Sequence, residues 1–393
     1  MNPSSIRIGA IGCGQFMSQQ HIQTIARRDH LVLQHLADID CGKLTEVANH
    51  YQPVRQSTRW EDVVNDPEVD IIVAGVLPNL HPQIARAAIE QGKPVYIEKP
   101  LAPTVEECLE VDRLSRKRGV PLAVGFNRRF APATQVMAHA FGTTQEPVSV
   151  YYRIADDDRI RPPAQNWKTN DRLLTETVHI FDLLSFLLQT EPVEIYARET
   201  RPNDAIVTLE FANGSRATVF SSSHASLAQP KEHAEAALGE GRFFEMDDYV
   251  ELRSYGLPDL DPVSTFAGRP YDRCDNRHVD AFAEHGLTAL IEQRRIYETA
   301  MRESGVLADS SDPAAQANAR ERLGNPPPPQ INYAPDKGWG EALEHFCTAA
   351  ATGQTPQNAN ACDGNRATAC AIAARQSINS RQPVRLDPAL WQS

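Results

Sequence analysis

The tripeptide Glu98-Lys99-Pro100 carries an amine that could act beside a bound cofactor, because of the segments that precede it. An apolar strand predicted at 6–11 runs into the glycine turn Gly12-Cys13-Gly14, and a helix-like stretch follows at 16–27. Such a strand, turn and helix N-terminus offer backbone N–H groups and a positive dipole to a pyrophosphate. Lys99 ends a later strand, predicted at 94–98, and strand carboxyl ends line the ligand crevice of a doubly wound sheet. We therefore expect Lys99 to lie where a nicotinamide ring would bind.

The glycine turn departs from the G-x-G-x-x-G pattern at its third glycine, because Met17 occupies that position. The third glycine normally lets helix and strand approach closely, so a methionine predicts looser packing or a shifted helix. A second strand, predicted at 31–37, ends at Asp38. Its carboxylate can accept hydrogen bonds from the adenosine ribose 2′-OH and would repel a 2′-phosphate, which predicts NAD as cofactor, with NADP less favoured. The alternative role of Asp38 is that of a helix N-cap or turn residue.

The composition limits the classes of function open to this chain. Its 393 residues suggest two domains, and 41% apolar residues are enough to form buried cores. The formal net charge of −12 argues against a nucleic-acid surface, which needs clustered lysine and arginine. Seven dispersed cysteines without a C-x-x-C pair indicate reduced thiols in the cytoplasm, and the histidines and cysteines show no metal-ligand spacing. The apolar runs are too short to span a bilayer, and the first strand begins too early to leave room for a signal peptide, so we expect a cytoplasmic protein without a membrane partner.

Two patterns of secondary structure divide the chain. Residues 1–125 alternate short apolar strands with helical stretches, which predicts an α/β Rossmann domain with a doubly wound parallel sheet. Residues 126–393 instead show strands between 148 and 255 with one early helix at about 173–188, and Asn213-Gly214 is a hairpin signal among them. We expect an α+β domain with a large, mainly antiparallel open sheet that serves substrate binding and oligomerisation. A charged, helix-like stretch at about 265–330 is interpreted as an insertion.

The order of several motifs resembles that of the Gfo/Idh/MocA oxidoreductases, which include glucose-fructose oxidoreductase and inositol dehydrogenases. These motifs are Gly9-x-x-Gly12-x-Gly14, His21, Asp38, Pro78-Asn79-x-His81, Glu98-Lys99-Pro100, Gly125-Phe126-Asn127-Arg128-Arg129-Phe130 and His179-x-x-Asp182. The resemblance covers nearly the whole chain except about 265–330, and it implies NAD(P)-dependent activity on sugars or cyclitols. It also implies pairing through the open sheet into a homodimer or homotetramer.

The same resemblance assigns roles to individual residues. Lys99 would hydrogen-bond both the nicotinamide ribose and the reacting hydroxyl, and His179 would transfer the proton. A lysine beside the positive nicotinamide ring has a lowered pKa, and a histidine already titrates near neutrality, so both residue types suit proton transfer. The other cofactor-binding residues would be Gly12, Gly14, Gln15, Phe16, Met17, Asp38, Pro78, Asn79, His81, Glu98, Asn127 and Arg128. Substrate would contact Lys99, Arg129, Trp167, Thr175 and His179, with Glu176 and Asp182 as further catalytic residues.

The helix around His179 has two interpretations. In an α-helix Thr175, His179 and Asp182 share one face, so Asp182 could orient the imidazole and fix its tautomer. The alternative is a satisfied core histidine, because the helix is largely apolar. In the inositol-dehydrogenase type an aspartate stands four residues before the histidine, whereas Thr175 stands there in this chain and Glu176 could partly replace it. This departure weakens a direct transfer of the inositol mechanism.

Other residues bear on the substrate. The helix segment from Arg172 to Asp182, with Lys231-Glu232 and Asp247-Asp248 later in the chain, resembles a branch of the family associated with polysaccharide biosynthesis more than the inositol-dehydrogenase type. This resemblance favours a sugar or sugar-derived substrate. Trp167 is interpreted either as an aromatic that stacks on a sugar face or as a domain-interface aromatic.

We interpret the chain as an NAD-dependent oxidoreductase that transfers a hydride between the nicotinamide ring and a secondary hydroxyl of a sugar, nucleotide sugar or cyclitol. Two alternatives stay open. One is an NAD-dependent redox-assisted glycosidase, in which a transient oxidation makes the glycosidic bond labile. The other is a catalytically inactive NAD-sensing regulator, which would have little need of Lys99 and His179 together.

Overall fold

The structure is a computed structural model of the chain that describes residues 5–160, 171–270, 280–307, 312–323 and 333–391. The chain divides into two compact units. The first contains the residues up to Phe130, Gly338–Ala369 and the residues from Pro388 onward, and the second contains Ala131–Lys337 and Cys370–Asp387. The first unit therefore includes late segments that lie within the predicted 126–393 domain, because chain order alone does not show which core a C-terminal helix joins.

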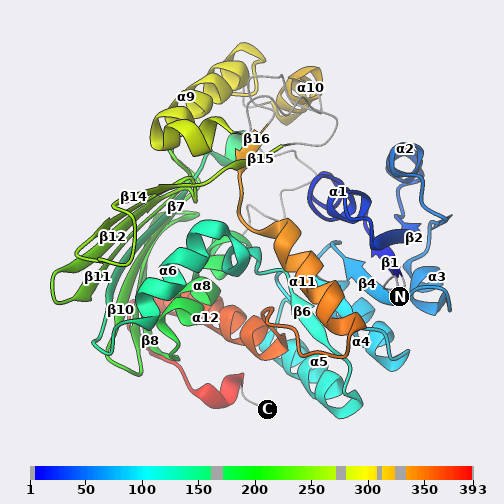
Figure 1. Cartoon of the computed structure of the whole chain (residues 1–393), viewed down its shortest axis with the longest axis horizontal. Helices are drawn as coiled ribbons and strands as arrows, with labels where there is room; N and C mark the ends of the chain where they lie inside the picture. The colour runs from blue at the N-terminus through cyan, green and yellow to red at the C-terminus, as the bar shows by residue number, and fades with distance from the viewer. Residues whose placement is uncertain (1–4, 161–170, 271–279, 308–311, 324–332, 392–393) are drawn as a thin grey trace. The chain divides into compact units, whose positions relative to one another are not determined.

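A six-stranded parallel sheet is the centre of the first unit, and it confirms the Rossmann prediction (Figure 1). Its strands are β1 (Ile6–Ile11), β2 (Leu31–Ala37), β3 (Arg55–Ser57), β4 (Ile71–Ala74), β5 (Val95–Ile97) and β6 (Leu122–Val124). The order β3-β2-β1-β4-β5-β6 is that of a dinucleotide-binding sheet. β1 pairs with both β2 and β4, so the order reverses at β1 and the ligand crevice is expected at the carboxyl end of this strand.

Helices and short helical turns complete the first unit. The α-helices are α1 (Gln23–Ala26), α2 (Cys41–Tyr51), α3 (Trp60–Asn65), α4 (His81–Glu90), α5 (Val105–Arg118) and α11 (Trp339–Ala351). A π-helix at Met17–Ile22 precedes α1, and 3-10 turns lie at Asn127–Phe130 and Pro388–Leu390. Asp40 is the N-cap of α2, and its carboxylate accepts hydrogen bonds from two amides of the first turn. Gly119 is the C-cap of α5, with φ +66°. These caps come directly from the local sequence.

The second unit is built on a nine-stranded mixed sheet, which confirms the prediction of a large, mainly antiparallel sheet. Its strands are β7 (Ser149–Ala155), β8 (Pro192–Arg201), β9 (Asp204–Phe211), β10 (Arg216–Ser222), β11 (Glu232–Gly239), β12 (Arg242–Asp247), β13 (Glu251–Tyr255), β14 (Val263–Thr265) and β17 (Val384–Arg385). Their order is β14-β13-β12-β11-β7-β10-β9-β8-β17, and the central β7–β10 pair is parallel. The predicted hairpin turn at Asn213-Gly214 joins β9 to β10, with φ +87° at the glycine.

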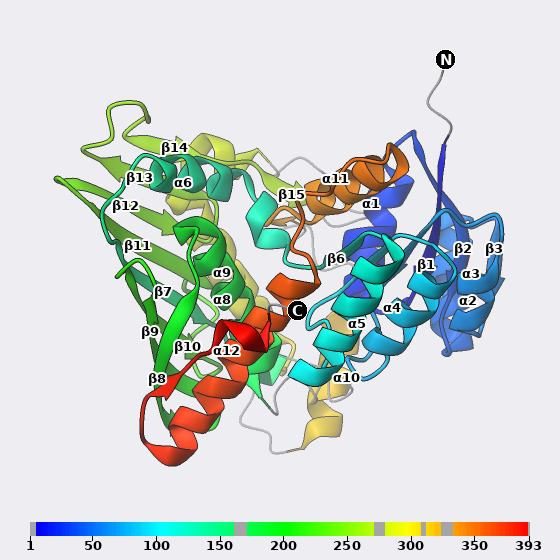
Figure 2. The same ribbon diagram turned by 90° about the horizontal axis from the view of Figure 1, so that it is seen from below.

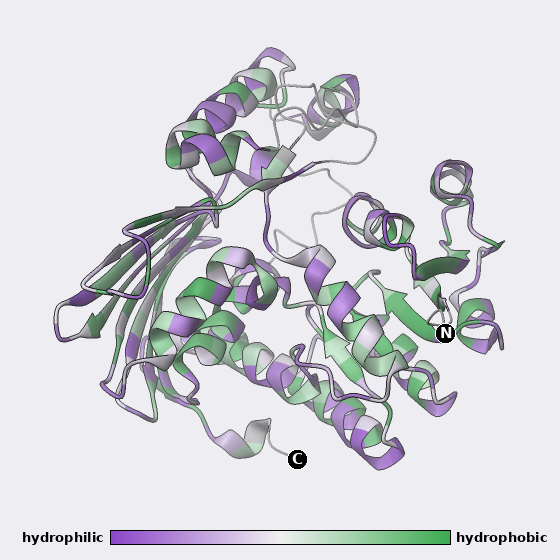
Figure 3. Ribbon diagram, viewed as in Figure 1, coloured by the Kyte–Doolittle hydropathy of each residue, from purple (hydrophilic) through white to green (hydrophobic). Residues whose placement is uncertain are grey.

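Helices lie along one side of this sheet, as Figures 1 and 2 show for α6 and α8. The helices and short strands outside the large sheet are α6 (Pro132–Gly142), α8 (Val178–Leu188), α9 (Ala281–Glu303), α10 (Pro313–Leu323), β15 (Gly268–Pro270) and β16 (Tyr333–Pro335), with a π-helix at Leu173–Thr177 and a 3-10 turn at Asp158–Ile160. α12 (Ala361–Ser380) belongs to both units, because its residues up to Ala369 are part of the first unit and those from Cys370 are part of the second. In Figure 3, α8 is mainly hydrophobic, whereas α9 and α10 of the predicted insertion carry many hydrophilic residues. The polyproline run at 326–329 lies outside the described residues.

Strand β11 lies between the strands predicted at 216–222 and 242–246 and was not itself predicted, and its sequence explains why. Glu, Ala and Leu dominate Glu232–Gly239, and these residues favour helices over strands. The segment is nevertheless a strand because it pairs with β7 on one side and β12 on the other. Tertiary pairing therefore overrides local propensity at the centre of the sheet.

Candidate active site

The glycine turn at the carboxyl end of β1 is shaped to receive a phosphate. Gly12 has φ +106°, and a Cβ atom there would collide with the carbonyl oxygen of Gly75, so this position requires glycine. Nothing lies within 4 Å of a Cβ position at Gly14, so the backbone there borders open space. Helical structure begins at Gln15, and burial raises the pKa of the intervening Cys13 thiol to about 12. The turn therefore offers backbone groups, and not a thiolate, to a pyrophosphate.

Met17 fits because Gly75, which directly follows β4, leaves room for its side chain. Its side chain is 1% exposed, and its Sδ atom lies 2.5 Å from the position that a Cβ of Gly75 would take. The absence of a side chain at Gly75 thus provides the room that a glycine at position 17 would otherwise provide. The surrounding segment Met17–Ile22 is a π-helix, and the close packing of Met17 does not agree with the looser packing that the methionine predicted.

Asp38 is fixed at the end of β2 by two backbone amides. One carboxylate oxygen accepts from the N–H of Cys13 at 2.6 Å, and the other accepts from the N–H of Asp40 at 2.8 Å. The first bond joins the glycine turn to the end of β2, and each oxygen keeps a lone pair for a hydroxyl group. The N-cap of α2 is Asp40, so Asp38 does not have the N-cap role that was its alternative interpretation.

Replacing Asp38 with serine is expected to weaken NAD binding at least tenfold, because a hydrogen bond to a charged group contributes about 1.5–3 kcal/mol. NADP binding should weaken less or improve, because the carboxylate that repels a 2′-phosphate is gone. Calorimetric titration of both dinucleotides measures the ratio. Asp40→Ser is the matched control, because serine preserves the α2 cap and leaves the glycine turn untouched. Equal affinity of the native protein for NAD and NADP would show that Asp38 does not select the cofactor.

Lys99 follows β5 at the same edge of the sheet as the glycine turn, because all six strands are parallel. The lysine is half-buried and its peptide bond to Pro100 is cis. The neighbouring Glu98 is 6% exposed, and its carboxylate lies 2.7 Å from the buried ring of His21. Lys99 is thus the more accessible member of the pair, and Glu98 points into the protein.

The remaining predicted cofactor residues of the first unit differ in exposure. Asn79 is exposed and Pro78 half-buried in the turn before α4, whereas His81 is buried. Gln15 is exposed, and the ring of Phe16 lies edge-on to Trp339 of α11 at 6.2 Å between centroids. These residues all lie in loops or at helix starts that follow strands of the parallel sheet.

The turn after β6 buries Asn127, Arg128 and Arg129. The Arg129 guanidinium lies 3.2 Å from the carboxylate of Asp363, which Arg366 also contacts at 2.6 Å. Burial would raise the pKa of Asp363, but the two guanidinium groups hold it below its usual value. This ion pair ties the turn to the start of α12, which lies in the same unit, so Arg129 has a structural partner besides its predicted role in substrate binding.

The second unit places its predicted residues around a change of helix type. Thr175 and Glu176 lie in the π-helix Leu173–Thr177, whereas His179 and Asp182 lie in α8. A π-turn holds more residues than an α-turn, so the α-helical spacing assumed for Thr175 and His179 is not met. His179 and Asp182 stand three residues apart in regular α-helix, and they are 6% and 1% exposed. The shared face is thus retained for this pair.

Glu176 belongs to a chain of charged groups. The Lys231 ammonium lies 3.2 Å from Glu176 and 2.8 Å from Asp156, and Asp156 accepts from the Arg172 guanidinium at 2.6 Å. Lys231 has the most exposed side chain of the four, at 23%. We call this set the Lys231 network. Asp156 was not singled out from the sequence, although the acidic run that it opens at the end of β7 was a signal that could have found it.

A second buried cluster adjoins the Lys231 network. Lys337 contacts Glu232 and Asp248, each at 2.6 Å, and all three side chains are at most 8% exposed. The backbone N–H of Lys231 donates to Asp248 at 3.2 Å, which joins this cluster to the network. Asp247 of the same sequence pair contacts His233 at 2.9 Å and Arg253 at 2.8 Å. Glu232, Asp247 and Asp248 therefore all have partners within this unit.

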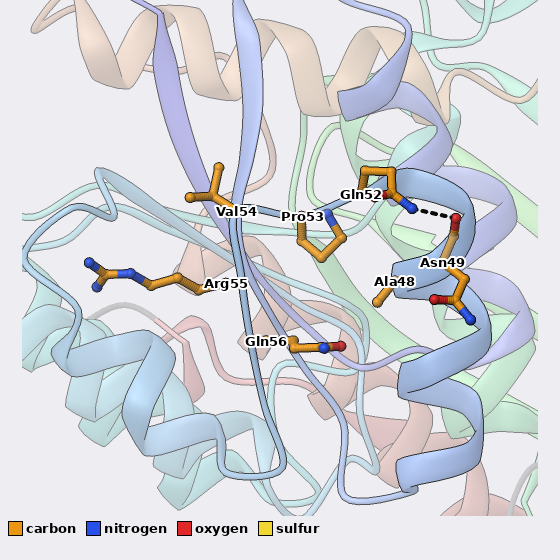
Figure 4. A pocket seen from close by; sticks show the side chains of 7 residues that line it. All are labelled: Ala48, Asn49, Gln52, Pro53, Val54, Arg55 and Gln56. Carbon is orange, nitrogen blue, oxygen red and sulfur yellow. Dashed lines mark hydrogen bonds between the residues drawn. The ribbon is translucent and has the colours of Figure 1, made fainter.

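Other candidate features lie elsewhere or outside the described residues. Figure 4 shows a depression between α2 and the start of β3, around Gln52–Gln56. It borders the amino end of β3, opposite the edge that carries Gly12 and Lys99, so it does not belong to the predicted site. Trp167 lies outside the described residues. Within the described ranges no group of three or more His, Cys, Asp or Glu side chains is arranged to hold a metal ion, and no helix there is long and apolar enough to cross a membrane.

Comparisons with known proteins agree with this geometry. Residues 6–126 match the family model described as "Oxidoreductase family, NAD-binding Rossmann fold" (GFO_IDH_MocA), which confirms the predicted resemblance and the NAD-binding character of the first domain. An inositol 2-dehydrogenase of Acidothermus cellulolyticus is 31% identical over 208 residues, which cover 51% of this chain and 58% of that enzyme. The match thus spans less than two thirds of that relative's length.

Solved structures share the fold over the whole chain. An oxidoreductase from Agrobacterium radiobacter in complex with NAD+, L-tartaric acid and magnesium has a TM-score of 0.73 at 14% identity and covers 97% of this chain and 98% of its own. The WlbA dehydrogenase from Bordetella pertussis in complex with NADH and UDP-GlcNAcA has a TM-score of 0.71 at 15% identity, and the coverage is 98% and 99%. At these identities the likeness establishes the fold of both units.

Proposed function

We propose that this chain, whose residues 6–126 belong to the Gfo/Idh/MocA family of NAD-binding oxidoreductases, is an NAD-dependent dehydrogenase. Its substrate would be a secondary alcohol of a sugar, nucleotide sugar or cyclitol. The observation that carries the proposal is the juxtaposition of the glycine turn and Lys99 at one edge of the parallel sheet. Gly12, Gly14 and Asp38 would hold the dinucleotide, which when bound accepts a hydride from the alcohol carbon.

Two residues are proposed to handle the proton. Alcohol oxidation removes a hydroxyl proton while hydride leaves the same carbon, so a positioned base accelerates it by about 10²–10⁴-fold. Lys99 would hydrogen-bond the reacting hydroxyl, and His179 would accept the proton. Asp182 would orient the imidazole, and the Lys231 network would hold Glu176 near the start of α8.

A substrate panel tests the proposal. Sugars, cyclitols and nucleotide sugars are mixed with NAD, and NADH absorbance is compared with the amount of oxidised product. The proposal requires NADH to form in stoichiometric amounts with the product, and Lys99→Met to lose this turnover while it still binds NAD. Cleavage of a glycoside without net consumption of NAD would instead establish the redox-assisted glycosidase. Binding of NAD with neither reaction across the panel would favour the regulator.

We further propose that the outer face of the nine-stranded sheet pairs with a second copy of the chain. Tyr196, Ile206, Tyr255 and Val263 on its strands are between 40% and 53% exposed, and Ile206 stands opposite Phe220 in the register. Tyr196 and Ile206 lie on β8 and β9, and Tyr255 and Val263 lie on β13 and β14, so the exposed apolar side chains are found toward both ends of the sheet. Large exposed apolar side chains on a sheet indicate a contact surface.

Ile206→Glu is therefore expected to halve the solution mass, because it buries a carboxylate at the proposed interface. Light scattering at micromolar concentration measures the mass of the native protein and of the variant. Val54→Glu is the matched control, since Val54 is similarly exposed but lies in the first unit. A native protein that is monomeric under these conditions would rule out the interface.

A further inference from the structure

We propose that two buried histidines, His21 and His81, act as positioning residues that clamp the backbone on either side of Lys99. The inference rests on the proposed function of Lys99 and deepens it. It also gives Glu98 and His81 a role different from the cofactor contact that the family resemblance implies. All the groups involved lie in the first unit.

On the amino side, Glu98 connects His21 to the lysine. His21 is fully buried, and its Nε2–H donates to one oxygen of the Glu98 carboxylate at 2.7 Å. The other oxygen accepts the backbone N–H of Lys99 at 3.3 Å. One carboxylate therefore links the helical segment after the glycine turn to the backbone of the lysine.

Packing holds the Glu98 carboxylate in this orientation. A Cβ atom at Gly125 would lie 2.5 Å from Glu98 Oε1 and 2.7 Å from its Cδ, so the carboxylate fills the space that a side chain would need. A Cβ at Gly75 would also lie 3.3 Å from Glu98 Cγ. The acid thus lies between two backbone segments and has little freedom to turn toward a ligand.

On the carboxyl side, His81 holds Pro100. The first residue of α4, His81 is 1% exposed, and its Nδ1–H donates to the carbonyl oxygen of Pro100 at 2.7 Å. Burial lowers the pKa of His81 and so favours the neutral ring, although this hydrogen bond acts in the opposite direction. The Pro100 carbonyl fixes the tautomer, because it needs a proton on Nδ1.

Lys99 lies between these two anchors with its own side chain half-buried. Since the backbone is tied to separate helical segments before and after it, the amine reaches its place by side-chain rotation alone. A misplacement of about 1 Å at a reacting group can cost about 10²-fold in rate, so loosening either anchor is expected to affect turnover strongly.

The chain offers a matched control in the same unit. His35 of β2 donates through Nδ1 to the carboxylate of Asp66 at 2.8 Å, and the two side chains are 6% and 4% exposed. This pair resembles the His21–Glu98 pair in burial and chemistry, but its carboxylate also contacts Arg55 and accepts the backbone N–H of Glu68, away from the Lys99 backbone. Losing its histidine should cost similar stability without moving the lysine.

The experiment compares His21→Leu, His81→Leu and His35→Leu. The first two are expected to lower kcat about 30–100-fold with less than about threefold change in the Kd for NAD, whereas His35→Leu stays within about threefold in kcat. His21→Gln and His81→Asn keep a donor near the original nitrogen and should restore most of the turnover. A readout without substrate is the labelling rate of the Lys99 amine by an amine-reactive reagent, followed by peptide mass spectrometry. It should change in the two clamp variants and not in His35→Leu.

Combination with Lys99→Met separates this inference from the function on which it rests. If the clamp acts through Lys99, adding His21→Leu to Lys99→Met costs nothing further in kcat. A multiplicative loss in the double variant, or unchanged Lys99 labelling in both clamp variants, would overturn the clamp. Native turnover by Lys99→Met would instead overturn the proposed role of Lys99. Should a leucine variant fail to fold, the Gln and Asn variants and the labelling rates decide the question.

Discussion

Lys99→Met is expected to lower kcat by about 10²–10⁴-fold, while the Kd for NAD changes by less than about threefold. Methionine keeps the length of the side chain but removes the amine that would hydrogen-bond the reacting hydroxyl. The pyrophosphate and adenosine contacts come from the glycine turn and Asp38, so cofactor binding should survive. Stopped-flow or steady-state NADH absorbance gives kcat, and calorimetry gives the affinity for NAD.

Lys93→Met is the matched control for this prediction. Lys93 precedes the opposite, amino end of β5, is half-buried, and donates to the backbone carbonyl of Asp66. Its loss should lower stability and leave kcat nearly native. A Lys99→Met protein that turns over at the native rate would mean that the lysine is not a catalytic residue, whatever the fold of the domain.

His179→Ala is expected to lower kcat by a similar factor of about 10²–10⁴, because it removes the proposed proton acceptor. Asp182→Asn should cost less, since it leaves the imidazole in place and only weakens its orientation. The pH profile of kcat/KM supplies a second test, because the native profile should show an ionisation in the range of a histidine that the alanine variant lacks.

The competing interpretation of His179 as a core residue makes a different prediction. His179 is 6% exposed on an apolar helix, so His179→Ala would then lower the melting temperature and leave turnover intact. Ser185→Ala, at another buried position of α8, controls for disturbance of the helix. Near-native turnover by His179→Ala would indicate that the base is Glu176 or Lys99 itself. If Lys99 and His179 act on one hydroxyl, the double variant should be far less than multiplicatively worse than either single variant.

The sequence by itself determined the elements and their types wherever the signal is local. Five of the parallel strands of the first unit follow from short apolar runs between helical stretches, whereas the short polar strand β3 was not predicted. The β9–β10 hairpin follows from Asn213-Gly214 between alternating strands. The position of Lys99 at the end of a strand follows from the same reasoning. These features depend on backbone hydrogen bonds and side-chain periodicity within a few residues, so neighbouring sequence is sufficient to predict them.

The partners of the functional side chains were decided only by the tertiary structure. His21 and Glu98 are 77 residues apart in the chain, and Lys231 and Glu176 are 55 apart, yet each pair is in contact. Met17 at the third glycine position is accommodated by Gly75, and β11 is a strand because β7 and β12 flank it. Each of these outcomes depends on which distant segment fills a given space. A single sequence displays the residue types that can meet, but only the packed chain brings particular ones within a few ångströms.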